Sequence, residues 1–284
     1  MDDRNTPSSE YSPELIAKYF DEYGLREWNR LLDTPVDEVG LYLHTYYLEQ
    51  HIAAGMRVLE IGAGAGRFTQ VLARLGARIL VADISQGQLE LNRQFARELG
   101  FANAVEDWQQ VDMCDLSRFT DASFDRVVAF GGPFSYVLDR RDVALSECLR
   151  VLKPGGLLLA SVMTIWGAAH RHLDGVMPLP PEVNQKITGT GDLTSATYPG
   201  RQSHFMHLFR AGEVREWLDQ AGIEILTMSA SGCLCTGWGD LLKSIREIET
   251  QWQELLRMER EACAEVESLN LGTHLIFVGG KRIS

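Results

Sequence analysis

The sequence predicts an α/β protein with a doubly wound, mostly parallel sheet. A short apolar run at 58–61 is typical of a buried parallel strand, and three glycines at alternate positions follow it before a helical pattern begins. The next apolar runs lead to Asp83 and Asp112, and helical patterns separate them. Strands that alternate with helices indicate βαβ units, whose ligands bind at the carboxyl ends of the strands.

The other elements follow from periodicity and from start and stop signals. Ser85 is placed to cap a helix over 86–99, and a Lys-Pro-Gly-Gly turn at 153–156 ends a helix over 139–152. Further helices are predicted over 13–32, 36–51, 68–75, 211–221 and 239–269. Strands are predicted over 58–61, 80–83, 123–128, 157–163, 223–228 and 273–278, and a further strand is predicted to end near Asp112.

The glycine spacing distinguishes between two kinds of nucleotide ligand. A dinucleotide-binding turn has the pattern G-x-G-x-x-G, which would need a glycine where Arg67 stands. The pattern here is instead an acid, Glu60, followed by Gly62, Gly64 and Gly66. It resembles motif I of the class I S-adenosylmethionine-dependent methyltransferases, and the resemblance extends from about 55 to 162 with the motifs in the family's order. The alternative is a tight turn without a ligand.

The resemblance implies S-adenosylmethionine as the cofactor and a seven-stranded sheet whose last strand is antiparallel. It also implies roles for single residues. The glycines would contact the methionine and ribose, and Glu60 would orient the cofactor's amino group through the glycine turn or satisfy backbone donors there. The other implied contacts are Asp83 with the ribose hydroxyls, Ile84 with the adenine face, Asp112 and Met113 with the far edge of the adenine, and Phe130, through its carbonyl, with the methionine amino group.

Two segments are candidates for the acceptor side of the site. Residues 1–50 are expected to form an N-terminal helical cap on a methyltransferase domain spanning 51–284, and 164–207 is too long for a plain connection. The cap either packs on the core or closes the cofactor cleft, as N-terminal helices often do in the resembled family. The insert is either a lid or a surface loop. Candidate acceptor-lining residues are Tyr19, Tyr23, Trp28, Tyr136 and Trp166.

Methyl transfer from a sulfonium mainly requires alignment of the nucleophile and exclusion of water. An amine acceptor needs only its neutral lone pair, whereas a hydroxyl or thiol gains from a general base, most often histidine. His204 and His207, at the end of the insert, are the candidate bases. No acidic cluster accompanies them at useful spacing, so no metal site is expected.

Composition restricts the partners. The net charge is −12 and the largest basic cluster is Arg140-Arg141, so a nucleic-acid partner is not expected. No run approaches the ~18 apolar residues of a membrane span, and no signal segment follows Met1. Five scattered cysteines indicate a reduced, cytoplasmic protein without structural disulfides.

The prediction is therefore methyl transfer from S-adenosylmethionine to a small-molecule acceptor. One alternative is a methyltransferase acting on protein or tRNA. Another is a cofactor-binding partner subunit without catalysis. The helix over 239–269 would be available for a homodimer interface.

Overall fold

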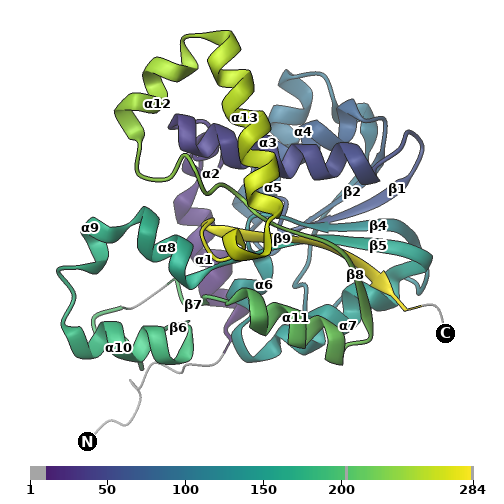
Figure 1. Ribbon diagram of the computed structural model, residues 1–284. Helices are drawn as coiled ribbons and strands as arrows, with labels where there is room; N and C mark the ends of the chain where they lie inside the picture. Colours follow the sequence, from purple (N-terminus) through teal and green to yellow (C-terminus); the bar gives the residue numbers. More distant parts are fainter. Residues whose placement is uncertain (1–10, 202–203, 283–284) are drawn as a thin grey trace, which may run out of the picture.

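A seven-stranded sheet in the order β3-β2-β1-β4-β5-β9-β8 forms the centre of the computed structural model, which describes residues 11–201 and 204–282 (Figure 1). The pairings among β1 to β5 are parallel, whereas β9 runs antiparallel to both neighbours. This confirms the predicted fold class, including the antiparallel last strand. The strands are β1 Arg57–Ile61, β2 Arg78–Asp83, β3 Val105–Gln110, β4 Phe124–Ala129, β5 Leu152–Met163, β8 Ile223–Ala230 and β9 His274–Lys281.

Helices cover both faces of the sheet, and successive side chains of the central strands enter different cores. On β5, Leu158 and Ala160 belong to one core and Leu159 to the other. Burial on both faces explains why these strands read as continuous apolar runs. Figure 1 shows one layer above the sheet, which includes α3 Pro35–His51, α4 Arg67–Arg74 and α13 Glu249–Ala264, and one below it, which includes α7 Arg141–Val151 and α11 Ala211–Gln220.

The N-terminal cap is fixed against the start of α5 (Gln86–Glu98). Of the cap predicted over 1–50, residues 1–10 lie outside the described part of the chain, and α3 packs in the main core; the name cap is therefore used below for α1 (Pro13–Tyr23) and the short α2 (Arg26–Asn29). One carboxylate oxygen of Asp21 accepts a hydrogen bond from the Ser85 hydroxyl at 2.5 Å and another from the Gly87 amide at 2.8 Å. These bonds hold the cap at the carboxyl edge of the sheet.

The insert predicted after strand five is present and has a small core of its own. Its apolar side chains come from both ends of the segment, among them Ile165, Ile187 and Met206. In Figure 1 it projects to the lower left of the sheet. Its elements are α8 Ile165–Arg171, α9 Leu173–Val176, α10 Pro181–Thr190, β6 Asp192–Leu193 and β7 Met206–His207.

The single helix expected over 239–269 is instead two helices, α12 (Gly239–Arg246) and α13, followed by a short 3₁₀ turn. Leu242 of α12 and Trp252 of α13 are buried in the same core. A straight helix would turn Trp252 about 80° away from the face that carries Leu242. The break after Arg246 therefore lets both apolar groups reach that core.

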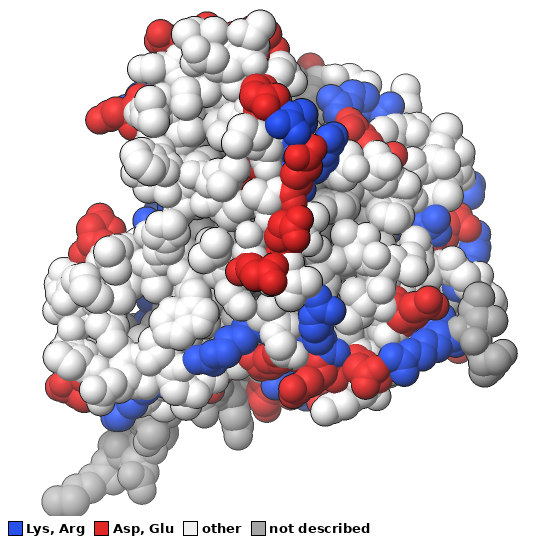
Figure 2. Space-filling view, in the orientation of Figure 1, with Lys and Arg blue, Asp and Glu red and all other residues white. Residues whose placement is uncertain are grey.

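Charged residues of both signs are interspersed on the face shown in Figure 2. Along α13, for example, Arg257 pairs with Glu254 at 2.6 Å and with Glu261 at 2.8 Å. This face lacks the continuous basic surface that a nucleic-acid partner would require. Within the described residues, no helix is long and apolar enough to cross a membrane.

Candidate functional site

A cavity of about 410 Å³ lies at the carboxyl edge of the sheet. Its position is the point where the strand order reverses around β1, which is where open α/β sheets bind ligands. One half is lined by the glycine turn and by the ends of β2 and β4, and the other by the cap, α3, the insert and the start of β9. The volume is suited to a small-molecule ligand.

The glycine turn brings backbone, without side chains, to the cavity wall. Gly62 and Gly64 line the cavity, and both have a positive φ. A Cβ atom on Gly62 would lie 2.5 Å from Cγ of Pro133, so this position accepts only glycine without movement of the neighbouring chain. Gly66 does not line the cavity. It caps α4 in a left-handed conformation, with Asn92 packed against it.

Asp83 lies at the end of β2 with its carboxylate fixed by the backbone. One oxygen accepts a hydrogen bond from the Gly64 amide at 2.8 Å, and the other accepts one from the Ser85 amide at 2.8 Å. Burial raises the pKa of Asp83 to about 6, although the two amides oppose this effect. Asp83 and the following residue, Ile84, both line the cavity.

Glu60 lies beneath the glycine turn and does not line the cavity. Its carboxyl group accepts a hydrogen bond from the Thr69 hydroxyl at 2.7 Å, and burial raises its pKa to about 8. The Asn92 amide donates to the same hydroxyl and to the Gly64 carbonyl. Glu60 thus contributes to a buried network that supports the turn from below.

In the half of the cavity that the glycine turn lines, Met113 also lines the wall, whereas Asp112 does not. One oxygen of Asp112 accepts hydrogen bonds from the Tyr11 hydroxyl at 2.7 Å and from the Cys114 amide at 2.8 Å. Tyr11 itself lines the cavity and was not predicted as a site residue. The Tyr11 hydroxyl therefore occupies one hydrogen-bonding position of Asp112.

Aromatic side chains line the second half. Tyr19 and Tyr23 of α1 stack with their ring centroids 5.8 Å apart, and Tyr136, in the turn after β4, also lines the cavity. Aromatic rings offer large apolar surfaces to a flat ligand. The cap and the turn after β4 are thus brought together around one space.

Two tryptophans predicted to line this half lie elsewhere. Trp28 stacks on Phe95 with centroids 4.0 Å apart, and the Arg67 guanidinium lies 3.7 Å from the centre of its ring. Trp166 is 46% exposed on the surface of the insert, with the Arg210 guanidinium over its ring. Neither lines the cavity.

His204 lies in the cavity wall, between two tyrosines. Its ring centroid is 4.1 Å from that of Tyr19 and 5.2 Å from that of Tyr136. Burial, together with the charge of Arg201, lowers its pKa to about 3, so the imidazole is neutral near pH 7. Among the described residues, its buried Nδ1 has no hydrogen-bond partner. A pKa this low makes the imidazole a weak base.

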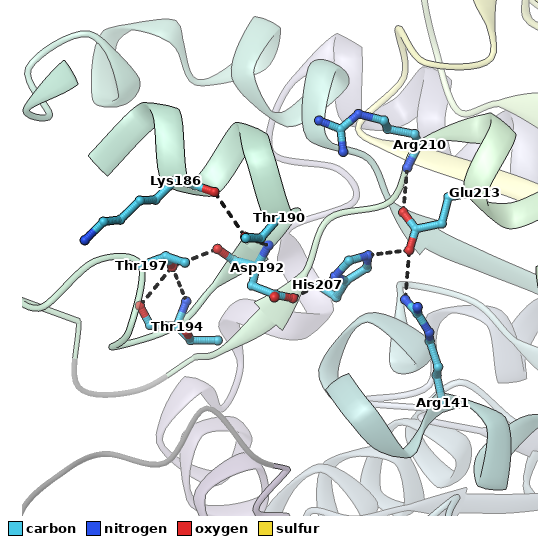
Figure 3. Close-up of polar contacts among 9 residues, drawn as sticks. All are labelled: Arg141, Lys186, Thr190, Asp192, Thr194, Thr197, His207, Arg210 and Glu213. Atoms are coloured by element: carbon cyan, nitrogen blue, oxygen red, sulfur yellow. Dashed lines mark hydrogen bonds and ion pairs between the residues drawn. The ribbon is translucent and has the colours of Figure 1, made fainter. Parts of the chain in front are cut away.

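His207 does not line the cavity. Figure 3 shows its ring between Asp192 and Glu213. Its Nδ1 lies 2.7 Å from an oxygen of Asp192 and its Nε2 lies 2.8 Å from an oxygen of Glu213. Burial lowers its pKa, but the two carboxylates outweigh that effect and raise it overall. Glu213 also binds Arg141 at 2.9 Å, so His207 links the insert to α11 and α7.

Three further histidines, His44, His172 and His274, line the cavity and were not predicted as site residues. His44 on α3 lies 2.7 Å from the Gly40 carbonyl and 3.2 Å from the Ser161 hydroxyl, and burial lowers its pKa to about 4. His274 begins β9, and burial lowers its pKa to about 3. His274 could be suspected as a cavity residue from its position in the sequence. It is a polar residue at the start of an apolar antiparallel strand, and that end of the strand lies at the carboxyl edge of its parallel neighbours.

Two pairs of charged side chains line the cavity. Arg30, beside Gly131, makes two contacts of 2.7 Å with the carboxylate of Glu27, and Arg171 of the insert lies 3.2 Å from Asp37. With these pairs and neutral histidines, the part of the cavity away from the end of β2 carries little net charge. It therefore favours a neutral, largely apolar ligand.

The sequence matches the family described as "Methyltransferase domain" over residues 59–160. It is 42% identical to a demethylmenaquinone methyltransferase of Clavibacter sepedonicus over 52% of this chain, and the match spans only 57% of that relative's length. It is 27% identical to a ubiquinone biosynthesis O-methyltransferase of Nitrosococcus oceani over 76% of this chain and 84% of the relative.

Solved structures share the fold. A crystal structure of the cyclase SpnF has a TM-score of 0.62 at 19% identity and covers 97% of this chain and 98% of its own. A structure of an S-adenosylmethionine-dependent methyltransferase from Methanosarcina mazei has a TM-score of 0.56 at 19% identity and covers 84% of this chain and 98% of its own.

The part of the chain that matches the family is the part that forms the cofactor half of the cavity. Residues 59–160 contain the strands and turns that build the cofactor half of the cavity, and the remainder of the chain supplies the cap, the insert and the last strands of the same sheet. Residues 59–160 thus match a methyltransferase domain, and the chain shares the Rossmann-like fold of an S-adenosylmethionine-dependent methyltransferase of known structure.

Proposed function

We propose that the chain transfers a methyl group from S-adenosylmethionine to a small, neutral, largely apolar acceptor that contains a ring. The observation that carries the proposal is one cavity with two unlike halves. The first half presents Gly62, Gly64 and Asp83, and the second presents aromatic side chains and neutral imidazoles. Cofactor and acceptor would lie in the same enclosed space.

The cofactor half fits an adenosyl group with an amino-acid tail. A carboxylate fixed by backbone amides, as in Asp83, suits a pair of ribose hydroxyls. Ile84 and Met113 offer apolar contacts for the adenine, whereas Asp112 could accept from its amino group only if the Tyr11 hydroxyl moved away. The absence of side chains at Gly62 and Gly64 leaves room for the methionine part of the cofactor. The Phe130 carbonyl would accept a hydrogen bond from its amino group.

The acceptor proposal is based on the charge balance of the second half and on the relatives. Arg30 and Arg171 are both paired, so a charged acceptor would find no free partner on those side chains. The names of the relatives place their substrates among demethylmenaquinone and the precursors of ubiquinone. Ring compounds with one hydroxyl and an apolar substituent are therefore the first acceptors to test.

The bound cofactor would supply an activated methyl group on a sulfonium leaving group. The task of the protein is then to align the acceptor, exclude water and receive a proton. Tyr19, Tyr23 and Tyr136 would hold the acceptor ring. The imidazole of His204, which lines the cavity, would take the hydroxyl proton, because this proton becomes strongly acidic as the oxygen–methyl bond forms and the methyl–sulfur bond breaks.

A labelled-methyl assay with a panel of quinols, phenols, amines, total protein and tRNA tests this function. We expect label in one class of ring compound and an equal amount of S-adenosylhomocysteine. Label in protein or tRNA would contradict the acceptor proposal. One solved neighbour with this fold is a cyclase, so cofactor binding without product in any acceptor would favour a role other than methyl transfer.

A further inference from the structure

Three side chains with metal-binding atoms meet behind the acceptor half of the cavity. Cys233 lies in the loop that follows β8, and Glu259 and Cys263 lie one turn apart on the same face of α13. Glu259 and Cys263 are fully buried, and Cys233 is half-buried. The three ligand atoms all lie within 4.8 Å of one another.

The distances within this cluster are close to those of a tetrahedral metal site. The two sulfur atoms are 3.6 Å apart, and the Cys263 sulfur lies 3.3 Å from an oxygen of Glu259. Bonds of about 2.3 Å to sulfur and about 2.0 Å to oxygen place two tetrahedral zinc ligands about 3.8 Å apart for a sulfur pair and about 3.5 Å apart for sulfur and oxygen. An ion could therefore enter with movements of a few tenths of an ångström.

Glu259 is oriented as a ligand by the backbone of the facing loop. One oxygen accepts a hydrogen bond from the Cys233 amide at 2.9 Å, and the other accepts one from the Cys235 amide at 2.5 Å. No ion pair to Glu259 exists within the described residues. A fully buried carboxylate without a cation is costly unless its charge is compensated, and backbone donors that fix a ligating carboxylate are typical of metal sites.

We propose that Cys233, Glu259 and Cys263 bind a zinc ion. Two thiolates and one carboxylate suit Zn²⁺, because soft sulfur ligands select it over magnesium or calcium. The half-buried side of Cys233 leaves a fourth position for water. A disulfide between the two cysteines would make no use of the oriented carboxylate.

The ion would connect the cavity wall to α13. Ser231, Gly232 and Thr236, which flank Cys233 in the loop, all line the cavity. With zinc bound, this wall would be attached to a long helix packed on the sheet. The role would be structural, and it does not depend on which acceptor is methylated.

The test is a zinc titration of the reduced, chelator-treated full chain against a chromophoric competitor. We expect one equivalent of Zn²⁺ to bind and to raise the melting temperature, since a ligand that binds only the folded state stabilises it. Co²⁺ in its place is expected to give thiolate-to-cobalt charge-transfer absorption. Absence of stoichiometric zinc binding would overturn the proposal, as would a Cys233–Cys263 disulfide that resists reduction.

Three variants locate the site. Cys233→Ser and Cys263→Ser are expected to weaken zinc binding by more than the roughly 10- to 100-fold that loss of an outer partner of a metal ligand costs. Cys235→Ser is the graded control: its thiol lies outside the group but also contacts Glu259, so its loss should cost no more than the roughly 10- to 100-fold of an outer partner. If Cys263→Ser fails to fold, zinc binding by Cys233→Ser tests the site, because Cys233 is only half-buried. Equal loss of binding in Cys235→Ser would refute the three-residue assignment.

Discussion

At the scale of single residues, Asp83 is the side chain on which cofactor binding depends most directly in this account. Its two oxygens are already held by the amides of Gly64 and Ser85, so the carboxylate would need no reorganisation when it meets the ribose. Such a fixed, charged acceptor makes stronger hydrogen bonds than a mobile one.

Asp83→Ala should therefore weaken binding of S-adenosylmethionine. Hydrogen bonds to a charged group contribute about 1.5–3 kcal/mol, which corresponds to roughly a 10- to 150-fold increase in Kd. Calorimetry measures the change. The control is Asp107→Ala, an exposed acid at the edge of the sheet, which should leave Kd unchanged. Similar affinities for both variants would exclude Asp83 as the ribose ligand.

Cofactor affinity should also depend on pH. Burial raises the pKa of Asp83 to about 6, and the ionised form is the better acceptor for two hydroxyls. Affinity should be constant above neutrality and fall as the pH decreases through 6 and the carboxylate is protonated. Titrations across this range check the prediction, and in Asp83→Ala this dependence should be absent.

His204 is predicted to affect the chemical step and not cofactor binding. If the acceptor is a hydroxyl, His204→Ala should lower kcat by roughly 10²- to 10⁴-fold. Because its pKa is lowered to about 3, the base is neutral at every pH above 5, so no acid limb near pH 6.5 is expected from this group. His170→Ala, an exposed histidine of the same insert, is the control. A kcat for His204→Ala equal to that of His170→Ala would rule out this role.

Residue-level prediction worked best where a residue type has a fixed place in a turn. Gly62 and Asp83 both line the cavity, and their contacts with a cofactor stay a prediction. His44 and His274 could not be found by periodicity, because a histidine on the buried side of a helix or strand gives the same pattern whether it faces a cavity or the core. Trp28 fits the aromatic stripe of the cap, yet it packs on Phe95 because Arg67 covers its other face.

At the scale of elements, the insert is attached to the rest of the protein through His207. Asp192 belongs to the insert and Glu213 to α11, and the imidazole lies between their carboxylates (Figure 3). Arg141 of α7 contacts the same carboxylate of Glu213. Because the folded pKa of His207 is raised, the protonated ring binds more tightly in the folded state than in the unfolded chain.

The stabilisation by His207 should therefore depend on pH in a defined direction. It is complete below the unfolded pKa of about 6.5 and is lost as the pH rises through the higher folded pKa. Melting temperatures of the wild type and of His207→Gln should differ most near pH 6 and converge in the alkaline range. His170→Gln is the control. A difference that stays constant with pH would show that His207 acts by packing alone.

Element boundaries were predictable where a capping side chain marks them. Ser85 accepts a hydrogen bond from the Gln88 amide at 3.0 Å and starts α5 as expected. The segment 239–269 has no glycine or proline in its interior, so its sequence gave no sign of the break between α12 and α13. That break follows from burial of Leu242 and Trp252 in one core, which is a tertiary effect.

At the scale of the whole molecule, the sheet could be predicted because both of its faces are buried and its strands are continuous apolar runs. The cavity could be predicted only in part. Its walls come from the cap, the glycine turn, the loop after β4, the insert, the loop after β8 and the start of β9. Which side chains of these distant segments meet depends on packing that no local pattern records.

Binding of S-adenosylmethionine in this cavity underlies every functional proposal above. Calorimetric titration of the full chain with S-adenosylmethionine and with S-adenosylhomocysteine, with NADH as the control, measures it. We expect saturable binding of the first two at one site per chain, and no binding of NADH. Binding of NADH, or no binding of either methionine derivative, would exclude this assignment of the cavity.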